Sequence, residues 1–240
     1  MQAQTGKAVA EDALVAVATN FAEVMETLAP TFEAATGHRL RVSSGSTGKL
    51  YAQIMNGAPF DVLLAADQRR AELLEASAQG VPGSRFSYAV GRLTLWSADA
   101  GRIGPDGAAA LTHGNFKHLA MANPKLAPYG LAAQQTLASL GLWDALQGRI
   151  VQGENIGQVF SLVATGNAEL GFVALSAVLT PRNRRPGSRW DVPVDLYRPI
   201  RQDAVLLMHG ADNAAARAFL VYLKSVETRK VIAAYGYGAD

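Results

Sequence analysis

The 240-residue sequence contains no cysteine, which excludes disulfide bridges, thiolate metal sites and a cysteine nucleophile. Charged residues make up only 18% of the chain, and the net charge is +2. This charge is spread out, and no basic stripe of the kind that binds nucleic acids is visible, so we expect no nucleic-acid partner. No apolar run reaches the roughly 20 residues needed to span a bilayer. With 49% apolar residues, the composition predicts an ordered protein with a substantial core.

Catalytic motifs are scarce as well. The four histidines are scattered and form no metal-binding spacing such as H-E-x-x-H: His38, His113, His118 and His209. His38 follows a glycine at the end of a predicted helix, where we expect a side chain at the surface. We therefore expect no enzymatic activity, no cofactor and no direct ligands for a metal cation.

The stretch SSGSTGKL, residues 43–50, is the most anion-friendly segment of the chain. A phosphate-binding P-loop requires G-x-x-x-x-G-K-[ST], but here Ser43 occupies the first glycine position and Leu50 follows the lysine. The spacing of this stretch also fails the serine-nucleophile motif G-x-S-x-G. The segment is therefore either a cradle for another kind of anion or an ordinary helix cap.

The chain alternates short apolar runs with longer amphipathic stretches, a pattern that predicts repeated strand–helix units around a parallel sheet. We expect strands at residues 13–18, 39–44, 60–67, 118–124, 149–154, 169–175 and 203–210. Helices are expected at 21–37, 47–57, 130–141 and 157–166, after Asp67 as an N-cap, and from residue 213 onward. The basic run 182–189 lies between proline and glycine and is typical of a solvated loop.

Two strand-rich stretches, 88–95 and 197–205, interrupt this alternation. We interpret them as paired crossover strands, at which the chain leaves a first α/β unit and later returns to it. This divides the sequence into a first lobe of residues 13–88 and 204–240 and a second lobe of residues 89–203.

The junctions between strands and helices are the candidate site, because ligands of open α/β sheets bind beyond the carboxyl ends of the strands. Four junctions are rich in small, hydroxylated or glycine residues, and each exposes backbone N–H groups where a helix begins. Each alone is more often a simple cap, but two in each block favour a cleft around one small anion. Lys49 is the only cation among them, and we expect it to point to solvent. The four junctions are residues 18–21, 43–48, 127–130 and 154–157.

At these junctions the sequence resembles the periplasmic molybdate-binding proteins of ABC transporters, over essentially its whole length. The matching stretches are ATNF, SSGSTG, QIMNGAPFDVLLAAD, NPKLAPYGLAAQ, ENIGQVFSLVATGNAELGFVAL and AAYGY. The resemblance implies a two-lobed α/β fold, the type II or Venus-flytrap periplasmic binding protein, with two hinge crossovers. It also implies high-affinity binding of molybdate or tungstate, and delivery to a membrane permease by a monomeric protein.

The resemblance also implies which residues hold the ligand. In the family, hydroxyls and main-chain amides bind the oxyanion without a cationic side chain. Carried over, the first lobe contributes Thr19, Asn20 and Thr47, and the second contributes the amides of Tyr129 and Ile156. The sequence departs from many members by having Thr19-Asn20-Phe21 in place of Ala-Ser-Leu, and Ala174 in place of a ligand-binding tyrosine.

The chemistry of these positions agrees with a fully deprotonated dianion, which only accepts hydrogen bonds. Hydrogen phosphate would need an acceptor, and no Asp or Glu occupies the predicted contact positions. Sulfate has the same requirement as molybdate, so a receptor for sulfate or another tetrahedral oxyanion stays open. A soluble oxyanion-sensing regulatory domain is a further alternative, although no DNA-binding segment is visible.

The N-terminal segment 1–12 lacks the hydrophobic core of a secretory signal. By itself this fits a cytosolic protein or a processed one. The resemblance favours a periplasmic protein whose signal peptide has been removed.

Overall fold

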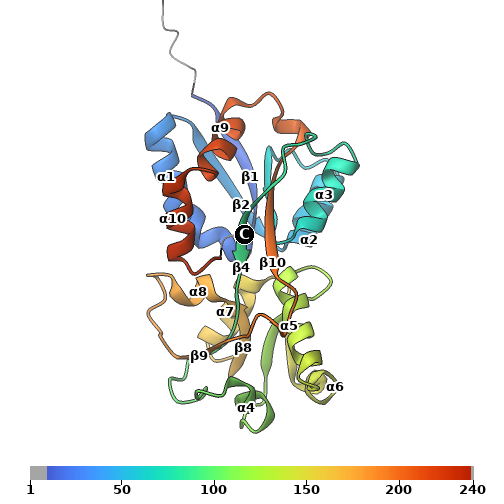
Figure 1. The fold of residues 1–240 in the computed structure, drawn as a ribbon, viewed down its shortest axis with the longest axis vertical. Coiled ribbons are helices and arrows are strands. Elements are labelled where there is room, and N and C mark those ends of the chain that lie inside the picture. The colour runs from blue at the N-terminus through green and yellow to red at the C-terminus, as the bar shows by residue number, and fades with distance from the viewer. Residues whose placement is uncertain (1–9, 239–240) are drawn as a thin grey trace, which may run out of the picture.

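The computed structural model describes residues 10–238, which form two α/β lobes, one above the other in Figure 1. The N-terminal segment discussed above therefore lies almost entirely outside the described residues. No helix within residues 10–238 is long and apolar enough to cross a membrane.

The first lobe is built on a five-stranded sheet with the order β2-β1-β3-β10-β4. β1 runs parallel to β2 and β3, whereas β10 is antiparallel to both β3 and β4. The strands are β1 (Asp12–Ala18), β2 (Arg39–Gly45), β3 (Val62–Leu64), β4 (Phe86–Gly91) and β10 (Ile200–Leu206). The helical elements are η1 (Thr19–Phe21), α1 (Ala22–Thr36), α2 (Thr47–Met55), α3 (Gln68–Ala76), η3 (Met208–Gly210), α9 (Ala214–Leu223) and α10 (Val226–Ala234).

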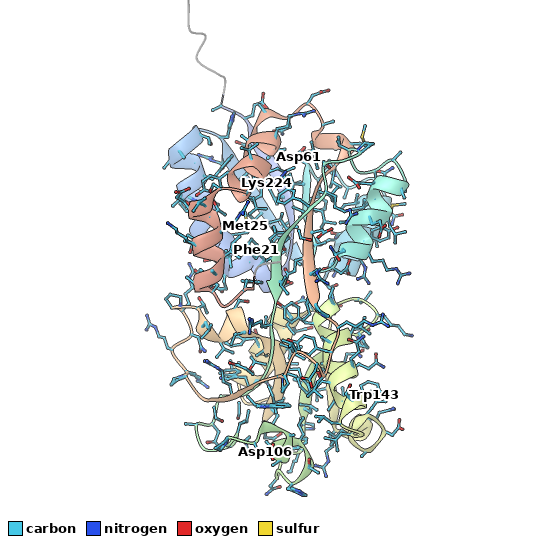
Figure 2. All side chains as sticks on the ribbon, viewed as in Figure 1. Phe21, Met25, Asp61, Asp106, Trp143 and Lys224 are labelled. Atoms are coloured by element: carbon cyan, nitrogen blue, oxygen red, sulfur yellow. The ribbon has the colours of Figure 1, made fainter. Side chains whose placement is uncertain are left out.

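Alternating side chains of the strands build a separate core on each face of this sheet, as strand geometry requires. Val15 and Val17 of β1 belong to the core shared with α1 and α9, and Ala16 belongs to the core shared with α2 and α3. Phe21 and Met25 lie inside this lobe (Figure 2), and the Phe21 ring packs edge-on against Tyr88 at a centroid distance of 4.8 Å.

The second lobe contains the sheet β7-β6-β8-β5-β9, in which β6, β7 and β8 are parallel and β5 is antiparallel to β8 and β9. Trp96 is fully buried there and stacks on Phe160. The strands are β5 (Leu93–Ser97), β6 (Leu119–Ala122), β7 (Ile150–Gly153), β8 (Leu170–Ala174) and β9 (Ser188–Asp191). The helical elements are α4 (Gly107–Thr112), α5 (Pro128–Ser139), α6 (Trp143–Leu146), η2 (Gln147–Arg149), α7 (Ile156–Ala164) and α8 (Leu175–Leu179).

Two connections join the lobes. The chain leaves the first sheet after β4, enters the second at β5, and returns to the first at β10. Because β4 and β10 are hydrogen-bonded neighbours, the chain leaves and re-enters the first lobe at adjacent points, near the centre of Figure 1. The predicted two-lobed α/β fold with two crossovers is thus confirmed.

Several local expectations need correction. Both sheets are mixed, because β10 in the first sheet and β5 in the second run antiparallel to both of their neighbours. The strand expected at 203–210 begins earlier, at Ile200, and its last residues form η3 because the chain turns there toward α9. The basic run expected to be a loop ends as the edge strand β9, which begins at Ser188.

His38 is buried, contrary to the surface position expected for it. Its side chain lies beside Phe32, and its Nδ1 atom accepts a hydrogen bond from the Glu11 amide at 3.1 Å. The turn after α1 places the ring beside the start of β1. The sequence around the helix end could not predict this contact, because Glu11 is 27 residues away.

Candidate functional site

The four predicted junctions converge on one small cavity between the lobes. A volume of about 10 Å³ is enclosed by residues that include every sequence-predicted site residue. Four of the five predicted site residues are no more than 6% exposed, so little of this part of the lining is accessible to solvent. The lining comprises Ala18, Thr19, Asn20, Gly45, Ser46, Thr47, Ala66, Ala127, Pro128, Tyr129, Asn155 and Ile156.

Helix N-termini supply most of this lining. α2 begins at Thr47, α5 at Pro128 and α7 at Ile156. The N-caps Ser46 and Asn155 accept hydrogen bonds from the third helical residue, which leaves the first amides of their helices pointing out of the helix end. Three helix ends that face one point create a positive electrostatic potential without a formal charge.

Two threonine hydroxyls of the first lobe also border the cavity. Thr19 Oγ1 is buried and has no hydrogen-bond partner among the described residues. Thr47 Oγ1 accepts a hydrogen bond from the Ala66 amide at 3.0 Å, which leaves its own hydrogen free to donate. An orphaned buried hydroxyl costs free energy unless something binds it, so the pair fits an acceptor placed between them.

The side chains of Asn20 and Tyr129 point away from the cavity into a buried polar network. Asn20 Nδ2 donates to Gln202 Oε1 at 2.8 Å, and Gln202 Nε2 donates to the Tyr129 hydroxyl at 3.2 Å. Tyr88 donates to the same Gln202 oxygen, and Tyr237 donates to the Asn20 carbonyl at 2.7 Å. These two predicted site residues therefore present only backbone groups to the cavity.

Burial keeps the tyrosines of this network neutral. It raises the pKa of Tyr237 to about 12 and the pKa of Tyr88 and of Tyr129 well above the ordinary value. Neutral hydroxyls can serve as both donor and acceptor, as the network requires. Gln202, fully buried in the crossover strand β10, connects the first-lobe loop at Asn20 with the start of α5 in the second lobe.

The lobes are closed over the cavity. The Gly48 amide donates to the Leu126 carbonyl at 2.9 Å, and Ser176 Oγ donates to the Asn20 carbonyl at 3.0 Å. Lys49 is exposed, as expected, and lies outside the cavity, where its ammonium forms an ion pair with Glu154 of the other lobe at 3.3 Å.

Two glycines allow the backbone to pack closely around the cavity, one between the lobes and one within the second lobe. A Cβ atom on Gly157 would come 2.4 Å from Thr19 Cγ2 in the opposite lobe. A Cβ on Gly130 would come 2.3 Å from the Ala122 carbonyl, so this glycine holds α5 tightly against the end of β6. The absence of side chains at both positions brings the helix ends within reach of one small ligand.

The character of the lining defines its chemistry. Within residues 10–238 it contains no carboxylate and no cationic side chain, and those residues hold no cluster of three or more His, Asp or Glu that could bind a metal ion. A closed cavity of hydroxyl and amide donors between two lobes suits a small, fully deprotonated anion. Fold and cavity together define a two-lobed solute-binding protein.

Comparison with known proteins agrees with this class. Residues 13–238 match the bacterial extracellular solute-binding protein family. The chain is 54% identical to the molybdate-binding protein ModA of Azotobacter vinelandii, over 95% of this chain and 90% of that one. It is 45% identical to ModA of Rhodobacter capsulatus, over 96% and 89%. The chain belongs to this solute-binding family and, within it, to the group of the molybdate-binding proteins.

A solved structure supports the same assignment. The periplasmic molybdate-binding protein of Azotobacter vinelandii superimposes with a TM-score of 0.91 at 43% identity, covering 95% of this chain and 99% of that one. The sulfate-binding protein SubI of Mycobacterium tuberculosis has a TM-score of 0.74 at 16% identity, a likeness of fold alone.

Residue types alone did not reveal the buried network. Gln202, Tyr88, Tyr237 and Ser176 come from distant parts of the chain and carry no shared motif. The available indication was Gln202 itself, an uncharged polar residue in the crossover strand β10.

Proposed function

We propose that this protein binds molybdate and tungstate with high affinity in the periplasm and delivers them to the permease of an ABC transporter. The observation that carries the proposal is the closed cavity of donors between the lobes, free of carboxylates within the described residues. We further propose that the protein acts as a monomer, without a cofactor, a nucleic-acid partner or catalytic activity.

Five residues would hold the oxyanion. Thr19 and Thr47 would donate from their hydroxyls, since one lacks a partner within the described chain and the other has a free hydrogen. Asn20, Tyr129 and Ile156 would donate from backbone amides, because the network occupies the polar side chains and Ile156 has none. A hydrogen bond to a charged group contributes roughly 1.5–3 kcal/mol, so a few such bonds suffice for tight binding.

The predicted lobe boundaries bear on delivery. They assign residues 13–88 and 204–240 to one lobe and 89–203 to the other, and both boundaries fall inside the paired strands β4 and β10. We propose these strands as the hinge, about which the second lobe swings to admit and release the anion.

Ligand-dependent melting tests the proposal. At about 100 times the dissociation constant, a ligand stabilises the folded state by roughly 2.7 kcal/mol. For a chain of this size, each kcal/mol raises the melting temperature by about 2–4 °C. Molybdate and tungstate should therefore shift the midpoint clearly, and phosphate should not.

Sulfate belongs in the same series, because it too is a dianion that only accepts hydrogen bonds. A shift with sulfate as large as that with molybdate would favour a general receptor for tetrahedral oxyanions. A flat response to both metal oxyanions, with a clear response to phosphate, would contradict the proposal.

A further inference from the structure

A second, larger cavity adjoins the small cavity between the lobes that would hold the oxyanion, which we call the oxyanion cavity. It has a volume of about 680 Å³, and Ala66 and Pro128 line both spaces. It lies on the flank of the molecule where α3 of the first lobe faces α5 of the second, beside the incoming end of β10 (Figure 1). We call this space the basic groove, because of the charges that line it.

The groove is far more positive than the chain as a whole. Its lining includes five cationic side chains and one acidic one, a formal charge of +4, compared with +2 for the entire sequence. The single carboxylate, Asp67, is engaged by Arg70. The Arg70 amide donates a hydrogen bond to it, and the Arg70 guanidinium forms an ion pair with it. The cations are Arg69, Arg70, Lys125, Arg198 and Arg201.

Residues that line the groove or lie next to the cavity lining form two hydrogen bonds between the lobes, which we call the wall. Arg70 Nη2 donates to the Lys125 carbonyl at 2.8 Å, and next to it the Gly48 amide donates to the Leu126 carbonyl at 2.9 Å. Each of these hydrogen bonds joins the first lobe to the second. Separation of the lobes would break both bonds and connect the groove directly with the cavity.

The division of charge between the two spaces suggests different tasks. A site of neutral donors selects its anion by shape and short hydrogen bonds, but it attracts a distant dianion only weakly. A cleft lined by charges of one sign concentrates counter-ions and raises association rates by about 10- to 1,000-fold, with a strong dependence on salt. Such charges influence the association rate more than the stability of the bound complex.

We propose that the basic groove is an entry vestibule that collects a tetrahedral oxyanion dianion and passes it to the neighbouring cavity when the lobes are open. This inference rests on the proposed function. It assigns the groove a kinetic role, and the closed wall then separates the bound anion from the collecting charges.

The test compares two triple variants that remove the same charge. The groove variant is Arg69→Gln/Lys125→Gln/Arg198→Gln, three exposed side chains of the lining. Lys125 contributes to the wall through its carbonyl, so its substitution leaves that hydrogen bond in place. The control variant is Lys117→Gln/Arg229→Gln/Lys230→Gln, three exposed cations that do not line the groove.

Stopped-flow fluorescence would measure the association and dissociation rates of molybdate at low salt and at 0.5 M salt. At 0.5 M salt the Debye length is below about 8 Å, so exposed charges farther apart than this are largely screened. At low salt the groove variant should associate at least about tenfold more slowly than the control, with dissociation rates within about twofold. The difference should largely vanish at high salt.

Equal association rates for the two variants would overturn the proposal that the basic groove is an entry vestibule. So would normal binding kinetics combined with a loss of uptake into vesicles that carry the transporter, which would make the groove a docking surface for the permease. A failure of the proposed function is distinguishable, because molybdate would then leave the melting temperature of the unmodified protein unchanged.

Discussion

The two lobes contribute to the oxyanion cavity in different ways. The first lobe offers the side-chain hydroxyls of Thr19 and Thr47, whereas the second offers the helix ends at Tyr129 and Ile156, whose side chains are engaged elsewhere or apolar. Half of the candidate site can therefore be altered by truncating a side chain. The other half can be altered only by changing how closely the backbone approaches the cavity.

This difference also separates chemistry from shape. Hydroxyls of the first lobe can be removed one at a time, so their contributions to affinity are measurable singly. The contribution of the second lobe depends on Gly130 and Gly157, where the backbone packs closely against its neighbours. A Cβ atom at either position would come within 2.3–2.4 Å of a neighbouring atom. The predictions below test each half in turn.

Thr47→Ala should have the largest effect on binding. The substitution removes a hydroxyl donor to a charged ligand, worth roughly 1.5–3 kcal/mol, so molybdate should bind about 10- to 150-fold more weakly. It also leaves the buried Ala66 amide without its acceptor. Thr47→Ser keeps the hydroxyl and should cost much less. Calorimetric titration of both variants measures this, and equal affinities would remove Thr47 from the site.

Gly157→Ala should weaken binding through shape alone. The added methyl group collides with Thr19 Cγ2 of the opposite lobe, and overpacking of this kind costs about 1–3 kcal/mol, or roughly 5- to 150-fold in affinity. Small-angle scattering with molybdate should show a larger radius of gyration than for the unmodified protein.

A matched second substitution sharpens this test. Thr19→Ser removes the Cγ2 atom and keeps the hydroxyl, and the next atoms then lie 3.4 Å or more from the new methyl group. The double variant Thr19→Ser/Gly157→Ala should regain most of the affinity. If it binds as weakly as Gly157→Ala, contact between the lobes at this point is not what limits closure.

The buried polar network around Gln202, which links the two lobes, should make the free energy of unfolding depend on pH in the alkaline range. Because burial raises the pKa of Tyr237 to about 12, the unfolded tyrosine ionises first, near its ordinary value of about 10. The stabilisation is complete below about pH 10 and is lost as the pH rises toward 12, by at most about 1.4 kcal/mol per pH unit.

Tyr237→Phe removes this contribution. In urea unfolding measured from pH 9 to pH 12, the unmodified protein should lose stability more steeply than the variant. Parallel curves would mean that the Tyr237 hydroxyl is not shielded in the folded state.

Lys49→Ala should have the smallest effect. The ammonium lies outside the cavity in an exposed ion pair with Glu154, and such pairs contribute about 0–1 kcal/mol, so affinity should fall by less than about fivefold. Titration beside Thr47→Ala gives a direct contrast. Abolished binding in Lys49→Ala, with little change in Thr47→Ala, would identify a cationic cradle instead of a donor-lined site.

Local patterns in the sequence determined much of the architecture. The alternation of strands and helices, the cap at Asp67 and the anion-friendly junctions depend on residues close together in the chain, where propensity and capping act. The same locality explains the resemblance, since four of its six matching stretches contain the junctions.

Tertiary structure alone decided the rest. The antiparallel place of β10, the burial of His38 and the network around Gln202 arise from contacts between segments more than 25 residues apart. The basic groove belongs to the same class, because Arg69, Lys125 and Arg198 come from three segments of the chain that are far apart in the sequence. Composition and spacing report what each segment prefers locally, whereas long-range packing decides which distant side chains share one space.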